Sequence, residues 1–280
     1  MLWDPCKGDG AVDKVMTLWK ETVWAGEKRG GRGEAYLFSV LPERPSLLED
    51  GRLLRDVTGQ EMPLIKYIDA EGALSVQVHP AANGETPGKD EVWFIDEIYD
   101  GGEVRIGFRR DVTPLEVERS CQDGTVLSLM EKISVAPGDV LWIPGGTIHA
   151  AKGISFWEVQ RSLDVTYRLF DYGRGRELQL AAGLSALQCQ RQPLRRSTRQ
   201  ELERSFFRDL PFFVLPRSLN GFASRRMPLP FAVVVTEGQG RWDGGSFGKN
   251  DCFWVREGER NRWRGKGNFF LIFPKISGNH

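Results

Sequence analysis

A short alternating stretch, Leu74 to Pro80, strongly limits what this chain can fold into. Successive side chains of a β-strand point to opposite faces. Val76 and Val78 would therefore share an apolar face, while Gln77 and His79 would share a polar one. The stretch predicts a strand that presents an amide and an imidazole side by side.

Two more residues extend this polar set. Glu91 follows the stretch closely, and His149 ends the segment Gly138-Asp-Val-Leu-Trp-Ile-Pro-Gly-Gly-Thr-Ile-His149, where a Pro-Gly turn delivers an imidazole to the next element. Imidazole, carboxylate and amide oxygen form a mixed ligand set that suits a borderline divalent ion such as zinc. Three or four such ligands leave room for water or substrate, as in catalytic sites. The predicted ligands of one divalent metal ion are Gln77, His79, Glu91 and His149.

An ordinary structural role is the alternative for each histidine. The chain has only three histidines, and the third, His280, is the last residue. Either His79 or His149 alone would more often be a hydrogen-bonded core residue than a ligand. Their occurrence together with a nearby glutamine and glutamate reverses that preference and favours a metal site.

These segments also resemble motifs of the cupin superfamily. The pattern Gly-x5-Pro-x-Gly-x2-His at 138–149 resembles the second cupin motif. Gln77-x-His79 followed by Glu91 resembles the first, with glutamine in place of its leading histidine. That replacement, within Leu74-Ser-Val-Gln-Val-His-Pro80, is similar to type I phosphomannose isomerases.

The similarity to this isomerase family continues beyond the ligands. It runs through Gly88-Lys-Asp-Glu-Val-Trp93 and Asp164-Val-Thr-Tyr-Arg-Leu-Phe-Asp-Tyr172, and it extends over residues 20–175. It implies a mainly β fold, a cupin or jelly-roll metal-binding domain with a short helical segment. It also implies a zinc-dependent isomerase that interconverts mannose 6-phosphate and fructose 6-phosphate.

The resemblance further implies roles for four residues. Glu158 would be the proton-transfer base and Arg168 a fixed cation, while Lys89 and Asp164 would bind the substrate. The pattern around Glu158 fits the barrel interior and the solvent face of an edge strand equally well. By pattern alone, Arg168 would more often form a surface salt bridge.

Two other functions remain open at this point. A metal-dependent cupin oxygenase would use iron and would usually have a histidine where Gln77 stands, so this glutamine disfavours it. A sugar-sensing cupin without turnover is disfavoured only weakly, through the presence of Lys89 and Arg168.

Composition excludes some classes of partner. The 38 basic and 38 acidic residues cancel, so no overall field attracts nucleic acid or a membrane. The arginine-rich segment 191–208 also contains glutamates and predicts a solvated face. No apolar run has transmembrane length, and the N-terminus lacks a secretory signal pattern. Cys6, Cys121, Cys189 and Cys252 form no paired motif, which predicts reduced thiols in a cytoplasmic protein.

The spacing of strands and turns predicts three segments. Residues 1–175 would form the catalytic cupin domain. Residues 176–210 would form a helical linking segment, because Leu180, Leu184 and Leu187 follow helical spacing. Residues 211–280 would form a second cupin-like β domain without a metal. We expect a monomer or a homodimer.

Overall fold

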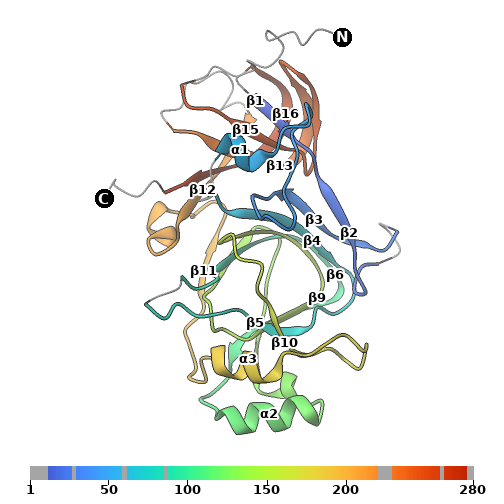
Figure 1. Ribbon diagram of the computed structural model, residues 1–280, viewed down its shortest axis with the longest axis vertical. Coiled ribbons are helices and arrows are strands. Elements are labelled where there is room, and N and C mark those ends of the chain that lie inside the picture. Colours follow the sequence, from blue (N-terminus) through green and yellow to red (C-terminus); the bar gives the residue numbers. More distant parts are fainter. Residues whose placement is uncertain are drawn as a thin grey trace. The chain divides into compact units, whose positions relative to one another are not determined.

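The protein forms two compact units, seen in a computed structural model that describes residues 12–26, 30–58, 62–84, 87–219, 229–258 and 262–275 (Figure 1). The larger unit consists of Trp19–Ala35 and Leu64–Glu201. The smaller unit consists of the described parts of Met1–Leu18, Tyr36–Pro63 and Leu202–His280.

This division differs from the three contiguous segments predicted, 1–175, 176–210 and 211–280. Strand β1 (Val12–Val15) pairs antiparallel with β15 (Cys252–Val255), which joins the start of the chain to its last part. Residues 36–63 belong to the same smaller unit. Pairing between such distant strands leaves no local trace in the sequence, so the strand pattern could not predict it.

The larger unit contains a ten-stranded sheet. Its main path runs in the order β11-β8-β6-β9-β4-β3-β2, with β5 pairing with both β9 and β10, and β7 pairing with β6. The strands are β2 (Leu18–Glu21), β3 (Arg32–Phe38), β4 (Leu64–Ala70), β5 (Val76–Val78), β6 (Glu91–Phe108), β7 (Met130–Ile133), β8 (Asp139–Ile143), β9 (His149–Gln160), β10 (Tyr167–Phe170) and β11 (Arg195–Thr198). The sheet curls around an interior, with β6, β9 and β4 adjacent along its wall (Figure 1).

Apolar side chains fill much of that interior. Trp93 of β6 and Phe156 of β9 stack with ring centroids 4.2 Å apart, and both are fully buried. Every residue of β4 and β8 is buried, which explains why these strands are mostly apolar on both faces rather than alternating, with Lys66 and Asp69 as the polar exceptions in β4. The apolar interior surrounds and desolvates the polar groups described below.

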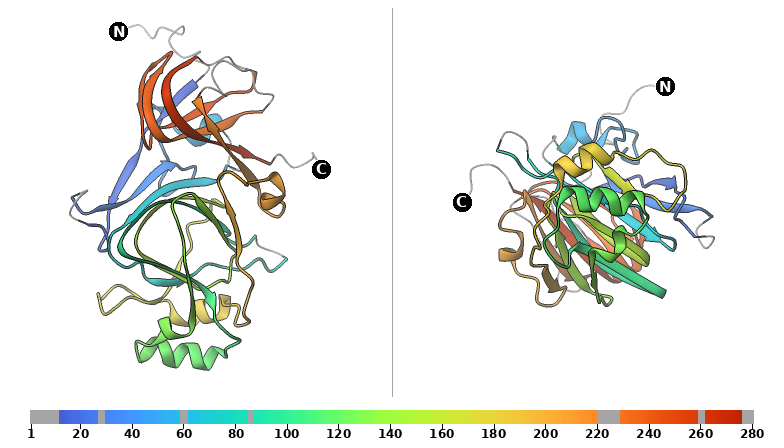
Figure 2. Two further views of the ribbon diagram at one scale, coloured as in Figure 1. Left: turned by 180° about the vertical axis from the view of Figure 1, so that it is seen from behind. Right: turned by 90° about the horizontal axis from the view of Figure 1, so that it is seen from below.

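Two short helices pack against each other and against β10 in the larger unit (Figure 2). Helix α2 (Pro114–Gln122) begins at the N-cap Thr113, whose side chain accepts a hydrogen bond from the Glu116 N–H. It ends before Gly124, which has a φ of 74°. Helical spacing continues to residue 130 in the sequence, but the chain turns at this glycine, passes through the 3₁₀ turn η3 (Val126–Ser128) and enters β7.

The predicted helical linking segment, 176–210, is only partly helical. Helix α3 (Leu180–Ala186) and the 3₁₀ turn η4 (Arg204–Phe207) lie within it, but so does strand β11, which pairs with β8. The two arginines of β11 contact side chains of the neighbouring strand β8. Arg195 lies over the Trp142 ring at 3.6 Å, and Arg196 pairs with Asp139 at 2.6 Å.

The smaller unit is a second β structure. Its sheet has the order β1-β15-β13-β16-β12, with β14 pairing with β13. The remaining elements are α1 (Leu54–Thr58), β12 (Phe212–Ser218), β13 (Phe231–Trp242), β14 (Gly245–Gly248) and β16 (Trp263–Pro274). Aromatic rings such as Phe231, Phe253 and Phe269 form its core.

The prediction of a mainly β fold is confirmed. In the described part of the chain, no helix has the length and apolar character needed to cross a bilayer. Cys121, Cys189 and Cys252 are buried free thiols. Cys6 lies outside the described residues.

Candidate metal centre

Three buried side chains converge inside the larger unit: His79 just after β5, Glu91 at the start of β6, and His149 at the start of β9. Their ligand atoms all lie within 4.8 Å of one another, and each residue is at most 2% exposed. Among the described residues, this is the one group of three or more His, Cys, Asp or Glu side chains with the spacing of a metal site.

The backbone fixes the tautomer of both imidazoles. His79 Nδ1 lies 2.9 Å from the carbonyl oxygen of Val165, and His149 Nδ1 lies 2.9 Å from that of Thr147. A carbonyl can only accept, so each Nδ1 carries the proton and donates it. Each Nε2 therefore keeps a lone pair, as in histidines that bind metals.

Two of the convergent atoms are acceptors placed very close together. His79 Nε2 lies 2.8 Å from Glu91 Oε1, yet it makes no hydrogen bond with any described residue. With its proton on Nδ1, this nitrogen presents a lone pair towards a carboxylate oxygen in a buried site. Two such acceptors need a cation between them, so these residues fit a bound metal ion.

Gln77 completes the predicted ligand set. It is opposite His149 in the pairing of β5 with β9, and its amide nitrogen lies 3.1 Å from His149 Nε2. The two ends of an amide are interchangeable by rotation, so the same side chain can turn its oxygen towards the centre. Gln77, His79, Glu91 and His149 thus lie together, as their sequence pattern suggested.

Burial sets the protonation of the centre. Desolvation, reinforced by the nearby His79, lowers the pKa of His149 to about 4. Desolvation also lowers the pKa of His79. Burial alone would raise the pKa of Glu91, but the positive charge of His79 whenever it is protonated, together with that of Lys89, outweighs this and holds that pKa well below the usual value. Neutral imidazoles and an ionised carboxylate are the forms that bind a divalent ion.

A glycine turn brings the two histidine-bearing segments together. The Gly146 N–H donates to the His79 carbonyl at 2.8 Å, and the Gly145 N–H donates to Asp90 Oδ1 at 3.0 Å. A Cβ at position 145 would collide with the backbone of Pro80. This close approach is the physical reason for the Pro-Gly-Gly sequence before His149.

A β-bulge brings Glu158 to the same side of β9 as His149. Strict alternation would place the two on opposite faces, because their positions differ by nine, an odd number. Gly153 has a φ of 60°, and the pairing of β9 with β6 is irregular there. Ala151 and Phe156 therefore face the same core, and Glu158 follows Phe156 by two residues. Glu158 is 6% exposed, which favours the interior over the solvent face of an edge strand.

Glu158 lies within a buried polar network. Its Oε1 atom is 3.6 Å from Lys66 Nζ and, with the Gln160 amide oriented to donate, 2.7 Å from the Gln160 nitrogen. The same nitrogen is 2.7 Å from Glu91 Oε1. Burial, helped by the charge of Glu91, raises the pKa of Glu158 to about 7, the range suited to proton transfer at neutral pH.

Sequence reasoning missed three members of this network: Glu34, Lys66 and Gln160. Lys66 offered one signal, a lysine inside the apolar run that became β4. Its partners come from β3 and β9, so only the fold reveals the cluster.

The remaining predicted site residues lie at different distances from the centre. Lys89 Nζ is buried 3.3 Å from Glu91 Oε1. Arg168 is opposite Gln77 in the pairing of β10 with β5, and its Nη1 donates to the Glu177 carbonyl at 2.7 Å. Asp164 is exposed, and no contact joins it to the three convergent ligands.

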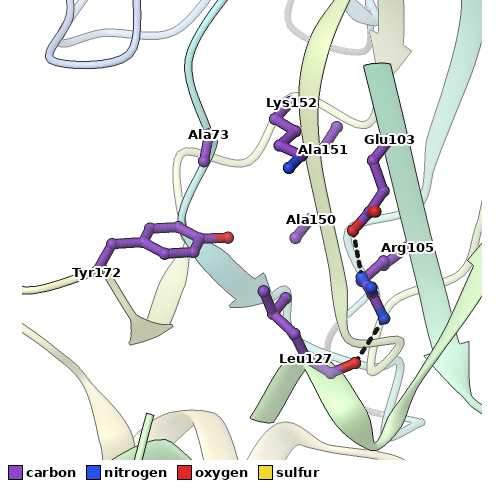
Figure 3. A pocket seen from close by; sticks show the side chains of 8 residues that line it. All are labelled: Ala73, Glu103, Arg105, Leu127, Ala150, Ala151, Lys152 and Tyr172. Carbon is purple, nitrogen blue, oxygen red and sulfur yellow. Dashed lines mark hydrogen bonds and ion pairs between the residues drawn. The ribbon is translucent and has the colours of Figure 1, made fainter. Parts of the chain in front are cut away.

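A separate cavity of about 240 Å³ lies elsewhere in the larger unit (Figure 3). Glu103 and Arg105 form an ion pair on one side, and the Tyr172 hydroxyl points inwards from the other (Figure 3). Its lining residues are Ala73, Glu103, Arg105, Leu127, Ala150, Ala151, Lys152 and Tyr172. None of these is a predicted ligand or catalytic residue.

Comparison with known proteins links this arrangement to one enzyme family. No protein-family model matches the chain. The mannose-6-phosphate isomerase ManA of Bacillus subtilis is 30% identical over 275 residues, covering 82% of this chain and 87% of that protein.

Solved structures agree on the fold. A mannose 6-phosphate isomerase from Bacillus subtilis superposes with a TM-score of 0.77 at 23% identity, covering 94% of this chain and 99% of that one. A mannose 6-phosphate isomerase solved with zinc and yttrium superposes with a TM-score of 0.69 at 12% identity, covering 95% and 100%. With the sequence relative and the buried His-Glu-His centre, these similarities show that the chain belongs to the type I phosphomannose isomerase family.

Proposed function

We propose that the chain is a metal-dependent aldose–ketose isomerase that interconverts mannose 6-phosphate and fructose 6-phosphate. The observation that carries this proposal is the buried cluster of His79, Glu91 and His149, with Glu158 connected to Glu91 through one amide. The cluster fits a Lewis-acid metal, and the second carboxylate fits a base. The names of the related proteins support mannose 6-phosphate as the substrate.

Gln77, His79, Glu91 and His149 would hold one divalent ion, and zinc suits this donor set best. A structural relative solved with zinc supports that choice. When bound, the ion polarises the substrate carbonyl or hydroxyl and orients the sugar. The second β unit would remain without a metal.

The chain's own residues would carry the proton. In the aldose-to-ketose direction, Glu158 removes the proton from C2 and delivers it to C1, while the proton on O2 moves to O1. A pKa near 7 lets this carboxyl group both accept and return the proton. Arg168 would stabilise negative charge that develops on oxygen. Lys89 and Asp164 would contact the phosphorylated sugar.

Two observations bear on the alternatives. A cupin oxygenase is disfavoured by the amide at position 77. A sugar-sensing protein would share the ligands, but it would not need a buried carboxyl group with a pKa near 7 beside them.

A coupled assay for fructose 6-phosphate tests the function directly. With mannose 6-phosphate as substrate, the protein should form fructose 6-phosphate, lose this activity after treatment with a chelator and regain it with added zinc. Binding of the sugar phosphate without turnover, in protein that contains metal, would instead support the sensor.

Replacement of Arg168 by alanine should lower kcat on the order of 10²-fold and leave the metal content unchanged, by analogy with loss of an oxyanion-hole donor. Its Nε atom is buried and has no hydrogen-bond partner among the described residues. Steady-state kinetics and elemental analysis provide the measurement. Arg168→Lys should recover part of the loss, because it keeps the charge but not the planar fork.

The matched control for Arg168 is Arg110→Ala, which removes an arginine that pairs with Glu116 at the surface. This control should behave like the unmodified protein. If Arg168→Ala raised KM alone, Arg168 would be a phosphate-binding residue without a role in the chemical step.

A further inference from the structure

Lys66 is a buried cation that the proposed chemistry does not itself require. It lies in β4, where all seven residues are buried, and is 7% exposed. Its Nζ atom is 3.0 Å from Glu34 Oε1 and 3.6 Å from Glu158 Oε1. It stands directly opposite Glu158 in the pairing of β4 with β9.

A buried ammonium is a costly way to fill a core position. Its desolvation is offset only by well-placed partners, and replacing a whole buried ion pair by apolar residues of similar volume is often neutral or stabilising. Lys66 has apolar neighbours on both sides in β4, so the strand itself would accept a methionine or leucine. Packing alone therefore does not account for a lysine at this position.

Glu34 anchors this lysine from the adjacent strand, β3. Its carboxylate is 12% exposed and contacts Lys66 through Oε1. The other oxygen of Glu34, Oε2, lies 3.6 Å from Lys20, which is 48% exposed. One carboxylate thus joins a buried lysine to a surface lysine, and only the buried one reaches Glu158.

The contacts of Glu158 are asymmetric. Both Lys66 and Gln160 approach the same oxygen, Oε1. Among the residues that the structure describes, the side-chain contacts of Glu158 use Oε1 and not Oε2. A carboxylate held by one oxygen keeps a fixed orientation, while the other oxygen can exchange a proton with a substrate.

We propose that Lys66, anchored by Glu34, is a positioning residue that fixes the orientation of Glu158 for proton transfer. This inference rests on the proposed isomerase function. Lys66 acts through Glu158 and does not itself contact the substrate. Gln160 completes the arrangement by linking Glu158 to the proposed metal ligand Glu91.

The test compares Lys66→Met, which keeps the length of the side chain and removes its charge, with the unmodified protein. We expect kcat to fall by about 10- to 100-fold, because small misplacement of a catalytic group is costly. Metal content and KM should stay within about twofold of the unmodified values, because a residue that acts only by positioning Glu158 makes no contact of its own with the metal or the ground-state sugar. Glu34→Gln should give a smaller fall, and Lys66→Arg should retain more activity than Lys66→Met.

Lys20→Gln is the matched control, because Lys20 contacts the same glutamate from the surface. It should leave kcat unchanged. A double-mutant cycle separates positioning from a structural role. In a Glu158→Gln background, Lys66→Met should cause no further loss of kcat, because the group that it positions is already gone.

The possible outcomes are distinct. Unchanged kcat in Lys66→Met, loss of its metal, or an equal further loss in the Glu158→Gln background would overturn the positioning role while leaving the isomerase function intact. Lack of turnover in the unmodified protein would overturn both. If Lys66→Met does not fold, Glu34→Gln and Lys66→Arg replace it in the double-mutant cycle with Glu158→Gln. If both of them lower kcat by the same factor with and without Glu158→Gln, the proposal is rejected.

Discussion

His149→Ala should lose both the bound metal and the isomerase activity. His149 is fully buried, and its Nε2 atom faces Glu91 Oε2 at 3.8 Å and the Gln77 amide at 3.1 Å. Alanine removes one of three strong ligands and leaves an incomplete coordination shell. Changes outside the ligand shell already cost 10- to 100-fold in metal affinity, so loss of a ligand should cost at least about 100-fold. Elemental analysis of the purified protein provides the measurement.

The unmodified protein should contain one metal ion per chain. Glu103→Gln is the control, because this carboxylate pairs with Arg105 and Lys132, away from the metal centre, and its loss should not change the metal content. Full metal retention in His149→Ala would show that the ligands have been assigned wrongly. Two equivalents in the unmodified protein would contradict the prediction of a metal-free second unit.

The proposed ligands Gln77, His79 and His149 could be singled out in the sequence because local geometry determines how each side chain is presented. The alternation around Gln77 and His79 needs only a strand, and the turn before His149 needs only its proline and glycines. Both features operate within a few residues. A strand and a turn that each present an imidazole can be predicted without knowing which strands they pair with.

The orientation of Glu158 could not be predicted, because it depends on one bulge. Alternation assigns each side chain to a face by its number of positions from a reference residue. The irregularity at Gly153 shifts this number by one for every later residue of β9. A glycine in a strand indicates a bulge only as one possibility among several. The sequence therefore left the interior and the solvent face equally possible, and the fold favours the interior.

Contacts between residues far apart in the sequence could not be predicted either, because they depend on how the strands pair. The sequence predicts a solvated face for the arginines of 191–208, because glutamates are mixed with them. In the structure, Arg195 and Arg199 lie over Trp142 and Trp157, which come from β8 and β9. The Glu34–Lys66–Glu158 contacts likewise join three strands. Such clusters follow from sheet order, which the sequence does not display.

Glu158→Gln should reduce kcat by about 100-fold or more while the protein keeps its metal and binds the sugar phosphate. A general base typically contributes 10²- to 10⁴-fold. Glutamine preserves the volume and can still contact Lys66 or Gln160 through its oxygen, but it cannot accept the C2 proton. Exchange of this proton with deuterated solvent, followed by NMR, isolates that step, and it should vanish in the variant. If exchange continued at the normal rate, another group would be the base, and the buried network around Lys66 would have to serve a different purpose.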